Sequence, residues 1–485
     1  MNRLLVLLFS CWAVAVQAQN FCEDSPALHL QSLEGTITRD DFETYLELPF
    51  QVPAGTQSIE VSFDYDRAQR TTIDLGLLDP NGFRGWSGGN KRSFVVSSFA
   101  ATPSFQTGPV VPGTWHLLLG VPNIREGVAA AYNASVRLAC ASQPDTAVLG
   151  SDRGAAWYRG DLHAHTGHSD GSCDSTLGER VPCPLFRSLE TATERGLDFI
   201  AVTDHNSVSQ NAGSLGLQDY FDQVLLIPGR EVTTFYGHAN VFGTTEFIDF
   251  RVQPELGRDA GFLHRQVAEL NALMSINHPG LPTGERCMGC GWVMPGTAFE
   301  EVAAIEVVNG SSVGNPSFPA SIAFWERQLN AGYRLTAIGG SDNHDAGRPT
   351  TDASAIGQPL TWIHAPQLSV QGILDGIRSG RAYVDVQGSG VRLTSFEVNG
   401  ATMGATVVGS GDLDLQAAWQ GPTGLRPRWV VNGEALAIQA SSTAAQNWRA
   451  SVARSDVPEK GWIRMDLVNE EGTIELLGNP VYLAP

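Results

Sequence analysis

The segment YRGDLHAHTGHSDG, from Tyr158 to Gly171, places three histidines within six residues, although the whole chain of 485 residues has only 11. Side chains on an extended strand repeat their direction every two residues, so His163 and His165 point to the same face and can bind one ion together. Imidazole nitrogens and carboxylate oxygens are the ligands of zinc, manganese and iron. The segment therefore predicts metal ligands at the end of a strand.

Short apolar runs of the same kind recur between residues 155 and 385, with helical patterns such as PLFRSLETATERG between them. They are LDFIAVTDH, VLLIPGREV, HANVFG, LMSINHP, VAAIEVVNG and LTAIGGSDNH. Alternating strands and helices predict a parallel sheet, and seven strands in about 230 residues favour a closed barrel. The predicted fold class is α/β, a distorted (β/α)7 barrel flanked by N-terminal and C-terminal β-sandwich domains.

Because the carboxyl ends of barrel strands meet at one mouth, the ligand-type residues at these ends are predicted to converge there. They are His163, His165, His205, Glu231, His238, His278, Asp342 and His344. Glu231 is placed to bridge two ions with its two oxygens. His264, in the helical pattern FLHRQ, is expected on the surface, and His29, His116 and His364 are expected to be structural.

Taken in order, DLHAHTGHSDG, TDHN, GREV followed by GHAN, NHP and GSDNH resemble the motifs of the polymerase-and-histidinol-phosphatase (PHP) hydrolases. The resemblance covers residues 155 to 385 and looks closest to the exported branch that includes carbaryl hydrolases. It implies a distorted seven-stranded barrel that holds two or three divalent ions, Mn, Fe or Zn. The implied first position uses His163, His165, Glu231 and Asp342, the second Glu231, His238 and His278, and the third Asp170, His205 and His344.

The implied chemistry is hydrolysis of a small-molecule substrate by a hydroxide between two ions, since metal lowers the pKa of water from about 16 to near 7. Asp342 is expected to carry a proton from the nucleophile to the leaving group, and His168 either contacts substrate or shapes its loop. Arg230 and Arg348 lie beside ligand segments and either pair with phosphate or form salt bridges at the rim. A phosphoesterase is favoured. A carbamate, ester or amide hydrolase and a non-catalytic surface binding protein stay open.

The flanking segments have a different composition. Residues 19–150 and 389–485 alternate apolar and polar residues and predict two β-sandwiches around a barrel over 151–388. A net charge of −20 disfavours nucleic acid and anionic membrane as partners. The oligomeric state is not predicted.

The first residues, MNRLLVLLFSCWAVAVQAQN, combine one arginine, an apolar run and a small-x-small cleavage pattern, which predict a signal peptide over residues 1–18. No later segment has the ~20 apolar residues of a spanning helix, so an exported protein, periplasmic or secreted, is expected. Six cysteines then remain, which favours disulfides, with Cys173–Cys183, Cys287–Cys290 and Cys22–Cys140 as the preferred pairs. Zinc binding by the CMGC sequence is the alternative.

Overall fold

The computed structural model describes residues 29–67, 70–89, 91–140, 154–284, 287, 289–438, 442–444 and 446–485. The chain forms two compact units, residues 1–97 with 104–141 and residues 98–103 with 142–485. The predicted signal peptide and Cys22 lie outside the described residues. Within the described part, none of the helices combines the length and the apolar character needed to cross a membrane.

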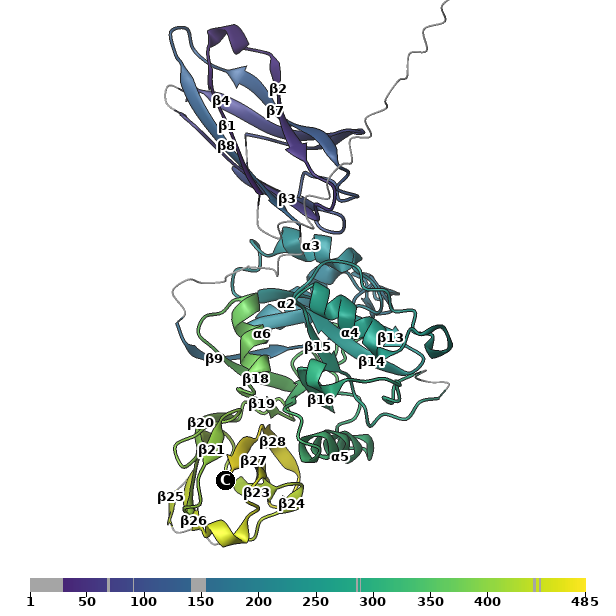
Figure 1. Ribbon diagram of the computed structural model, residues 1–485, viewed down its shortest axis with the longest axis vertical. Helices are drawn as coiled ribbons and strands as arrows, with labels where there is room; N and C mark the ends of the chain where they lie inside the picture. The colour runs from purple at the N-terminus through teal and green to yellow at the C-terminus, as the bar shows by residue number, and fades with distance from the viewer. Residues whose placement is uncertain are drawn as a thin grey trace, which may run out of the picture. The chain divides into compact units, whose positions relative to one another are not determined.

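The first unit consists of two four-stranded antiparallel sheets that form a β-sandwich (Figure 1). Period-two alternation builds it, because residues such as Val61, Leu75 and Trp115 are buried while their strand neighbours face outward. In spatial order, one sheet contains β1 (His29–Ile37), β8 (Ala130–Ala139), β3 (Ser58–Tyr65) and β6 (Ser93–Ser97), and the other contains β2 (Tyr45–Val52), β7 (Gly113–Asn123), β4 (Thr72–Asp79) and β5 (Gly82–Gly88).

The second unit is built on a row of strands that, except for β9, are buried at almost every residue. In spatial order these are β9 (Ala156–Asp161), β12 (Phe199–Val202), β13 (Leu225–Thr234), β14 (Gly237–Phe242), β15 (Leu273–Ile276), β16 (Ala304–Asn309) and β17 (Thr336–Gly340). The main connecting helices are α2 (Leu185–Glu194), α3 (Ser209–Leu217), α4 (Ala260–Glu269) and α5 (Ser317–Asn330). Continuous burial of the strands explains why they read as uninterrupted apolar runs.

This row differs from the predicted (β/α)7 barrel. Strand β14 is antiparallel to both of its neighbours, and only Phe235 and Tyr236 separate it from β13. Two residues form a hairpin turn and leave no room for a helix, and Gly237 has a positive φ of 154° at the point of reversal. The structure is therefore mixed α/β and does not show seven β/α repeats.

The two ends of the row nevertheless meet at the carboxyl ends of β9 and β17. The backbone amide of Asp342 donates to the carbonyl of His163 at 2.9 Å, and the amide of His165 donates to the carbonyl of Asn343 at 2.8 Å. These two bonds place the first and last segments that carry candidate ligands side by side.

The sheet continues past residue 388 into the C-terminal region. Beyond β9 it runs through β18 (Leu360–Ala365), β19 (Ala382–Asp385), β28 (Ile474–Gly478), β27 (Gly461–Val468), β23 (Arg426–Val431) and β24 (Glu434–Ala435). Helix α6 (Val370–Arg378) lies between β18 and β19, and β21 (Thr406–Val408) and β29 (Val481–Ala484) join beside β27. A second sheet of β20 (Arg392–Val398), β22 (Leu413–Gln420), β26 (Asn447–Val452) and β25 (Ser442–Ala444) packs on it through a shared apolar core.

Two predicted cysteine pairs are brought together. Cys173, in β10 (Ser172–Asp174), is bonded to Cys183, which follows β11 (Arg180–Pro182), with a Cα–Cα distance of 4.9 Å. Cys287 and Cys290 are bonded in the loop after β15, with a Cα–Cα distance of 5.6 Å. Both pairs thus lie at disulfide distance, as the disulfide interpretation of CMGC predicts.

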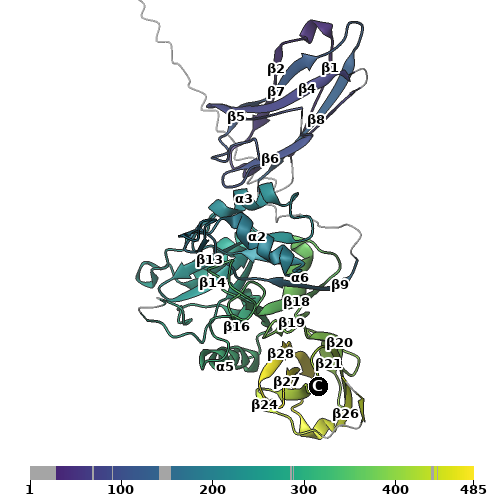
Figure 2. The same ribbon diagram turned by 180° about the vertical axis from the view of Figure 1, so that it is seen from behind.

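A buried arginine ties α5 to the C-terminal sheet, which lies next to that helix in both views of the ribbon (Figures 1 and 2). Arg464 contacts Glu326 of α5 at 2.6 Å and Asp466 at 3.1 Å, and its side chain is 2% exposed. The guanidinium also lies over the ring of Trp325 at 5.3 Å. Arg428 contacts Asp466 as well, at 2.9 Å, but its side chain is 35% exposed.

We expect Arg464→Ala to lower the free energy of unfolding of the second unit by about 3 kcal/mol, because it leaves two acids without their buried cation. Arg428→Ala, which removes a more exposed partner of the same carboxylate, should cost below about 1 kcal/mol. Urea unfolding of both variants measures the difference. Equal losses would contradict the assignment of Arg464 as the main tie.

Asp385 ends β19, where the sheet passes toward the C-terminal region. Burial raises the pKa of its carboxyl to about 6, although the backbone amides of Gly390 and Ser389 donate to it and oppose the shift. In an unfolded chain the pKa is about 3.9, so the folded chain binds the extra proton between these two values.

The stability contributed by this proton is fully present below about pH 4 and is lost as the pH rises through about 6. Asp385→Asn cannot titrate, so the stability of the native chain relative to this variant should fall by up to about 3 kcal/mol across that window. Unfolding curves at a series of pH values measure it. A difference that stays constant with pH would show that the pKa of Asp385 is not raised in the folded chain.

Candidate metal centre

The ligand segments are fixed by a buried acid and a glycine at the junction of β9 and β17. Asp161, fully buried, accepts from the backbone amides of His163 at 3.1 Å, Ser341 at 3.0 Å and Gly357 at 2.7 Å. At Gly340, a Cβ atom would lie 2.5 Å from the Cβ of His163, so only glycine fits there. Asp161 therefore organises the backbone beneath the ligands.

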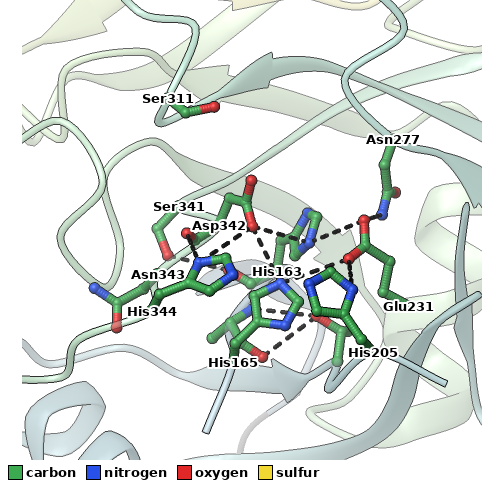
Figure 3. Close-up of polar contacts among 12 residues, drawn as sticks. His163, His165, His205, Glu231, Asn277, Ser311, Ser341, Asp342, Asn343 and His344 are labelled. Atoms are coloured by element: carbon green, nitrogen blue, oxygen red, sulfur yellow. Dashed lines mark hydrogen bonds and ion pairs between the residues drawn. The ribbon is translucent and has the colours of Figure 1, made fainter. Parts of the chain in front are cut away.

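The carboxylate of Glu231, buried on β13, lies among five imidazoles, of which Figure 3 shows those of His163, His165 and His205. Its Oε1 is 3.5 Å from His163 Nε2, 3.3 Å from His278 Nε2 and 3.4 Å from His238 Nδ1. Its Oε2 is 2.7 Å from His205 Nδ1. Both oxygens thus face imidazole nitrogens from different strands.

Asp342 supplies a second carboxylate beside the first. Its Oδ1 lies 3.3 Å from His163 Nε2 and 3.1 Å from His165 Nε2. Asn309 donates its side-chain amide to the other oxygen at 3.2 Å. The backbone of Asp342 has a φ of 53°, a left-handed conformation that is uncommon outside glycine and directs this side chain toward the histidines.

A third group lies nearer the solvent. Asp170 Oδ1 is 3.4 Å from His344 Nε2 and 3.7 Å from His205 Nε2, and the Asp170 side chain is 59% exposed. The ring of His165 stacks between those of His205 and His344, with centroid distances of 4.3 Å and 4.1 Å. His165 is thus shared between the buried and the exposed parts of the cluster.

The cluster brings together all nine residues that the sequence resemblance implies as ligands. Groups whose candidate ligand atoms lie within 4.8 Å of one another are His165, Asp170, His205 and His344; His163, His165 and Asp342; and His163, Glu231 and His278. A fourth such group joins His238 and His278 to Cys290, whose sulfur is in a disulfide. The implied third position matches the first group except that His165 is added.

The hydrogen bonds of the imidazoles fit metal binding. The Nδ1 atoms of His163, His278 and His344 are held by Glu306 Oε1 at 2.9 Å, the Cys290 carbonyl at 3.3 Å and the Asp342 carbonyl at 2.8 Å. Their Nε2 atoms face the carboxylates of the cluster. Metal-ligating histidines commonly have one nitrogen fixed in this way and the other directed at the ion. The donor set therefore suits divalent cations such as zinc, manganese or iron.

The charges in the cluster are strongly coupled. Burial alone would lower the pKa of His163, but the carboxylates of Glu306, Asp342 and Glu231 outweigh it and hold that pKa well above 6.5. Burial lowers the pKa of His165 to about 4. Burial would raise the pKa values of Glu231 and Asp342, but the surrounding imidazoles hold both well below the usual range. At neutral pH the cluster thus offers ionised carboxylates and a neutral His165.

Three predicted functional residues are not brought into the cluster. Arg230 points away because it neighbours Glu231 on a strand, and its buried guanidinium donates to the Thr244 carbonyl at 2.9 Å, which does not fit a substrate contact. Arg348 pairs with Asp352 at 3.1 Å. The exposed ring of His168 lies 2.7 Å from the Ser209 hydroxyl.

The prediction that His264 lies on the surface is wrong. Its side chain is buried, because positions 260, 263, 264 and 267 form one face of α4 that packs on the core. His364 stays outside the cluster, with its ring 5.5 Å from that of Trp157.

Sequence reasoning missed the polar residues behind the ligands. Glu306 is buried in β16 and accepts from His163 Nδ1, from the His278 backbone amide at 3.1 Å and from the Asn309 amide at 3.1 Å. Asn277 donates to Glu231 Oε1 at 2.8 Å. The available signal was a single acid within the apolar run AIEVVN, since a charged side chain is rarely buried in a strand unless it is paired.

Comparisons with known proteins give weak similarities. No family model and no curated protein matches the chain. A two-domain protein from Bacteroides vulgatus that contains a predicted PHP-like metal-dependent phosphoesterase is 19% identical with a TM-score of 0.37, over 71% of this chain and 99% of that one. A candidate metal-dependent phosphoesterase from Bifidobacterium adolescentis is 16% identical with a TM-score of 0.25, over 39% and 88% of the two chains.

A third solved structure, the periplasmic inhibitor of g-type lysozyme PliG from Aeromonas hydrophila, is 12% identical with a TM-score of 0.16, over 24% of this chain and 90% of that one. These TM-scores are low, so none of the three similarities assigns a function.

We expect Glu306→Gln to weaken metal binding about 10- to 100-fold while the chain stays folded. Glutamine replaces one of the two accepting oxygens with an NH2 group that can only donate. That NH2 group would face either His163 Nδ1 or the donors of His278 and Asn309, which also donate. Calorimetric titration of the metal-free chain with zinc or manganese measures the affinity.

The matched control is Glu301→Gln, which alters an acid with a 55% exposed side chain that contacts His264 outside the cluster. It should leave metal affinity unchanged. Native affinity in Glu306→Gln would show that Glu306 does not position the histidines.

Proposed function

We propose that this chain is a metal-dependent hydrolase that uses two or three divalent ions, and that its substrate is a phosphoester. The supporting observation is the convergence of His163, His165, Asp170, His205, Glu231, His238, His278, Asp342 and His344 in overlapping groups of ligand atoms. Ions bound there would supply positive charge that lowers the pKa of water and stabilises negative charge on the reacting oxygens.

Glu231 and Asp342 differ in solvent exposure, and this difference suits them to different roles. Glu231 is buried and surrounded by imidazoles, so it can hold two positions of the cluster together without contacting bulk water. The side chain of Asp342 is 14% exposed and lies at the accessible side. Its carboxylate is placed to accept a proton from an attacking water and to return it to the leaving group.

The outer group favours a phosphoester over a carboxyl-type bond. Asp170, His205 and His344 form a third ligand group beside the two buried ones. A phosphoryl centre has several oxygens that can each lie on a different ion, whereas a carbonyl centre has one. The resemblance to carbaryl hydrolases also suggests hydrolysis of carbamates or esters. The substrate test must therefore distinguish this activity from phosphoester hydrolysis.

Export to the periplasm or beyond belongs to the same proposal. It is supported by the signal-like residues 1–18 and by the two cysteine pairs at disulfide distance. An oxidising compartment would keep these pairs bonded.

With manganese, iron or zinc restored to the chelated chain, we expect hydrolysis of aryl phosphates or phosphodiesters, and Asp342→Asn should lower kcat about 100-fold or more. A panel of aryl phosphates, phosphodiesters, carbamates and carboxyl esters measures the bond preference, and elemental analysis measures ions per chain. Asp345→Asn, which alters an acid paired with Arg180 outside the cluster, is the control.

Activity on carbamates or esters alone would overturn the phosphoester assignment and leave the metal centre in place. No activity on the panel, with fewer than two ions bound per chain, would favour a non-catalytic binding protein.

A further inference from the structure

The outer face of the sheet β2–β7–β4–β5 carries aromatic side chains that the sandwich core does not use. Leu75, Leu77, Leu117 and Leu119 are buried between the sheets, so the residues between them point outward. The outward set includes Tyr45, Glu47, Asp74, Gly76, Leu118 and Gly120, with Trp86 opposite Gly76 in the register.

Trp86 lies against the backbone of two neighbouring strands. A Cβ atom on Gly76 of β4 would be 2.6 Å from Trp86 Cε3, and one on Gly120 of β7 would be 2.7 Å from Trp86 Cη2. The six-membered ring of the indole therefore occupies the space that side chains at both positions would fill. Glycine weakens strand interiors and often marks a close approach of this kind. The pair of glycines lets one face of the ring rest on the sheet and turns the other outward.

Tyr45 stands at the edge of this ring. The two ring centroids are 5.9 Å apart with an interplanar angle of 63°, and Tyr45 is 71% exposed. Tyr45 lies opposite Gly120, so the indole reaches it across the empty glycine position. The two rings form a corner on the sheet surface, in which the Trp86 ring lies on the sheet and the Tyr45 ring stands beside its edge.

Acidic groups border the corner. Asp74 lies opposite Gly120 on β4, and Glu47 is two residues beyond Tyr45 on β2. The outward positions of β2, β4 and β7 include these two acids and neither lysine nor arginine. A polyanion would therefore be repelled, whereas hydroxyl groups can donate to the carboxylates.

We propose that the corner formed by Tyr45 and Trp86, with Asp74 at its border, binds the pyranose rings of a neutral polysaccharide. The C–H groups of a pyranose ring form a flat apolar surface that matches the exposed face of an indole, and its hydroxyls lie at the ring edge where Asp74 can accept them. This site belongs to the first unit and does not depend on the proposed hydrolase function.

The test is affinity gel electrophoresis of the full chain with hydroxyethyl cellulose, xylan, galactomannan or glycol chitin in the gel, and with alginate and casein as polyanion and protein probes. We expect retardation by at least one neutral polysaccharide and none by alginate or casein. Trp86→Ala and Tyr45→Ala should each weaken the retarding affinity about tenfold or more.

Leu30→Ala is the matched control, because Leu30 is an exposed apolar residue on β1 of the other sheet and should leave retardation unchanged. Circular dichroism confirms folding, and Tyr45→Ala, which removes an exposed ring, decides the outcome if Trp86→Ala fails to fold. No retardation by any neutral polysaccharide, or native retardation in Tyr45→Ala, would overturn the proposal. Retardation by casein that is lost in the same variants would replace it with a protein-binding face.

Discussion

The two backbone hydrogen bonds between the ends of β9 and β17 are the constraint on which the candidate metal centre depends. They join His163 to Asp342 and His165 to Asn343, segments separated by almost 180 residues. Without them the two histidines and the aspartate would belong to opposite ends of a row of strands. Asp161 beneath this junction and the missing side chain at Gly340 allow the two backbones to approach closely enough for these bonds.

Acidic and imidazole side chains lie close together and buried at this junction. Glu231, Asp342 and Glu306 lie within hydrogen-bonding or ion-pair distance of the imidazoles, and isolated ionised carboxylates would be costly to bury there. The pairs offset that cost, and their geometry keeps ring nitrogens directed at carboxylate oxygens. The same arrangement that keeps the folded chain electrostatically balanced also pre-positions ligands for cations.

The convergence of the candidate ligands could be predicted from sequence because most of them lie at or just after the end of an apolar run and have side chains that favour metals, as His205 does after LDFIAVT. The reversal of β14 could not be predicted, since the apolar run HANVFG carries no signal for parallel or antiparallel pairing. Only the short turn at Phe235 determines the direction of the strand. The position of Glu306 behind the histidines could not be predicted, because one acid in an apolar run is compatible with many roles. The corner at Tyr45 and Trp86 was hidden because the two rings are 41 positions apart and meet only through strand pairing.

The continuous sheet from β9 to β24 has a consequence for how this chain can be divided. A cut near residue 388 would not release a self-contained module, because β19 would lose its pairing with β28 and present an unpaired strand edge. It would also leave Glu326 of α5 without the guanidinium of Arg464. The region after residue 388 therefore acts as a structural flank of the strands that hold the cluster, and shuffling it between proteins would require moving those strands as well.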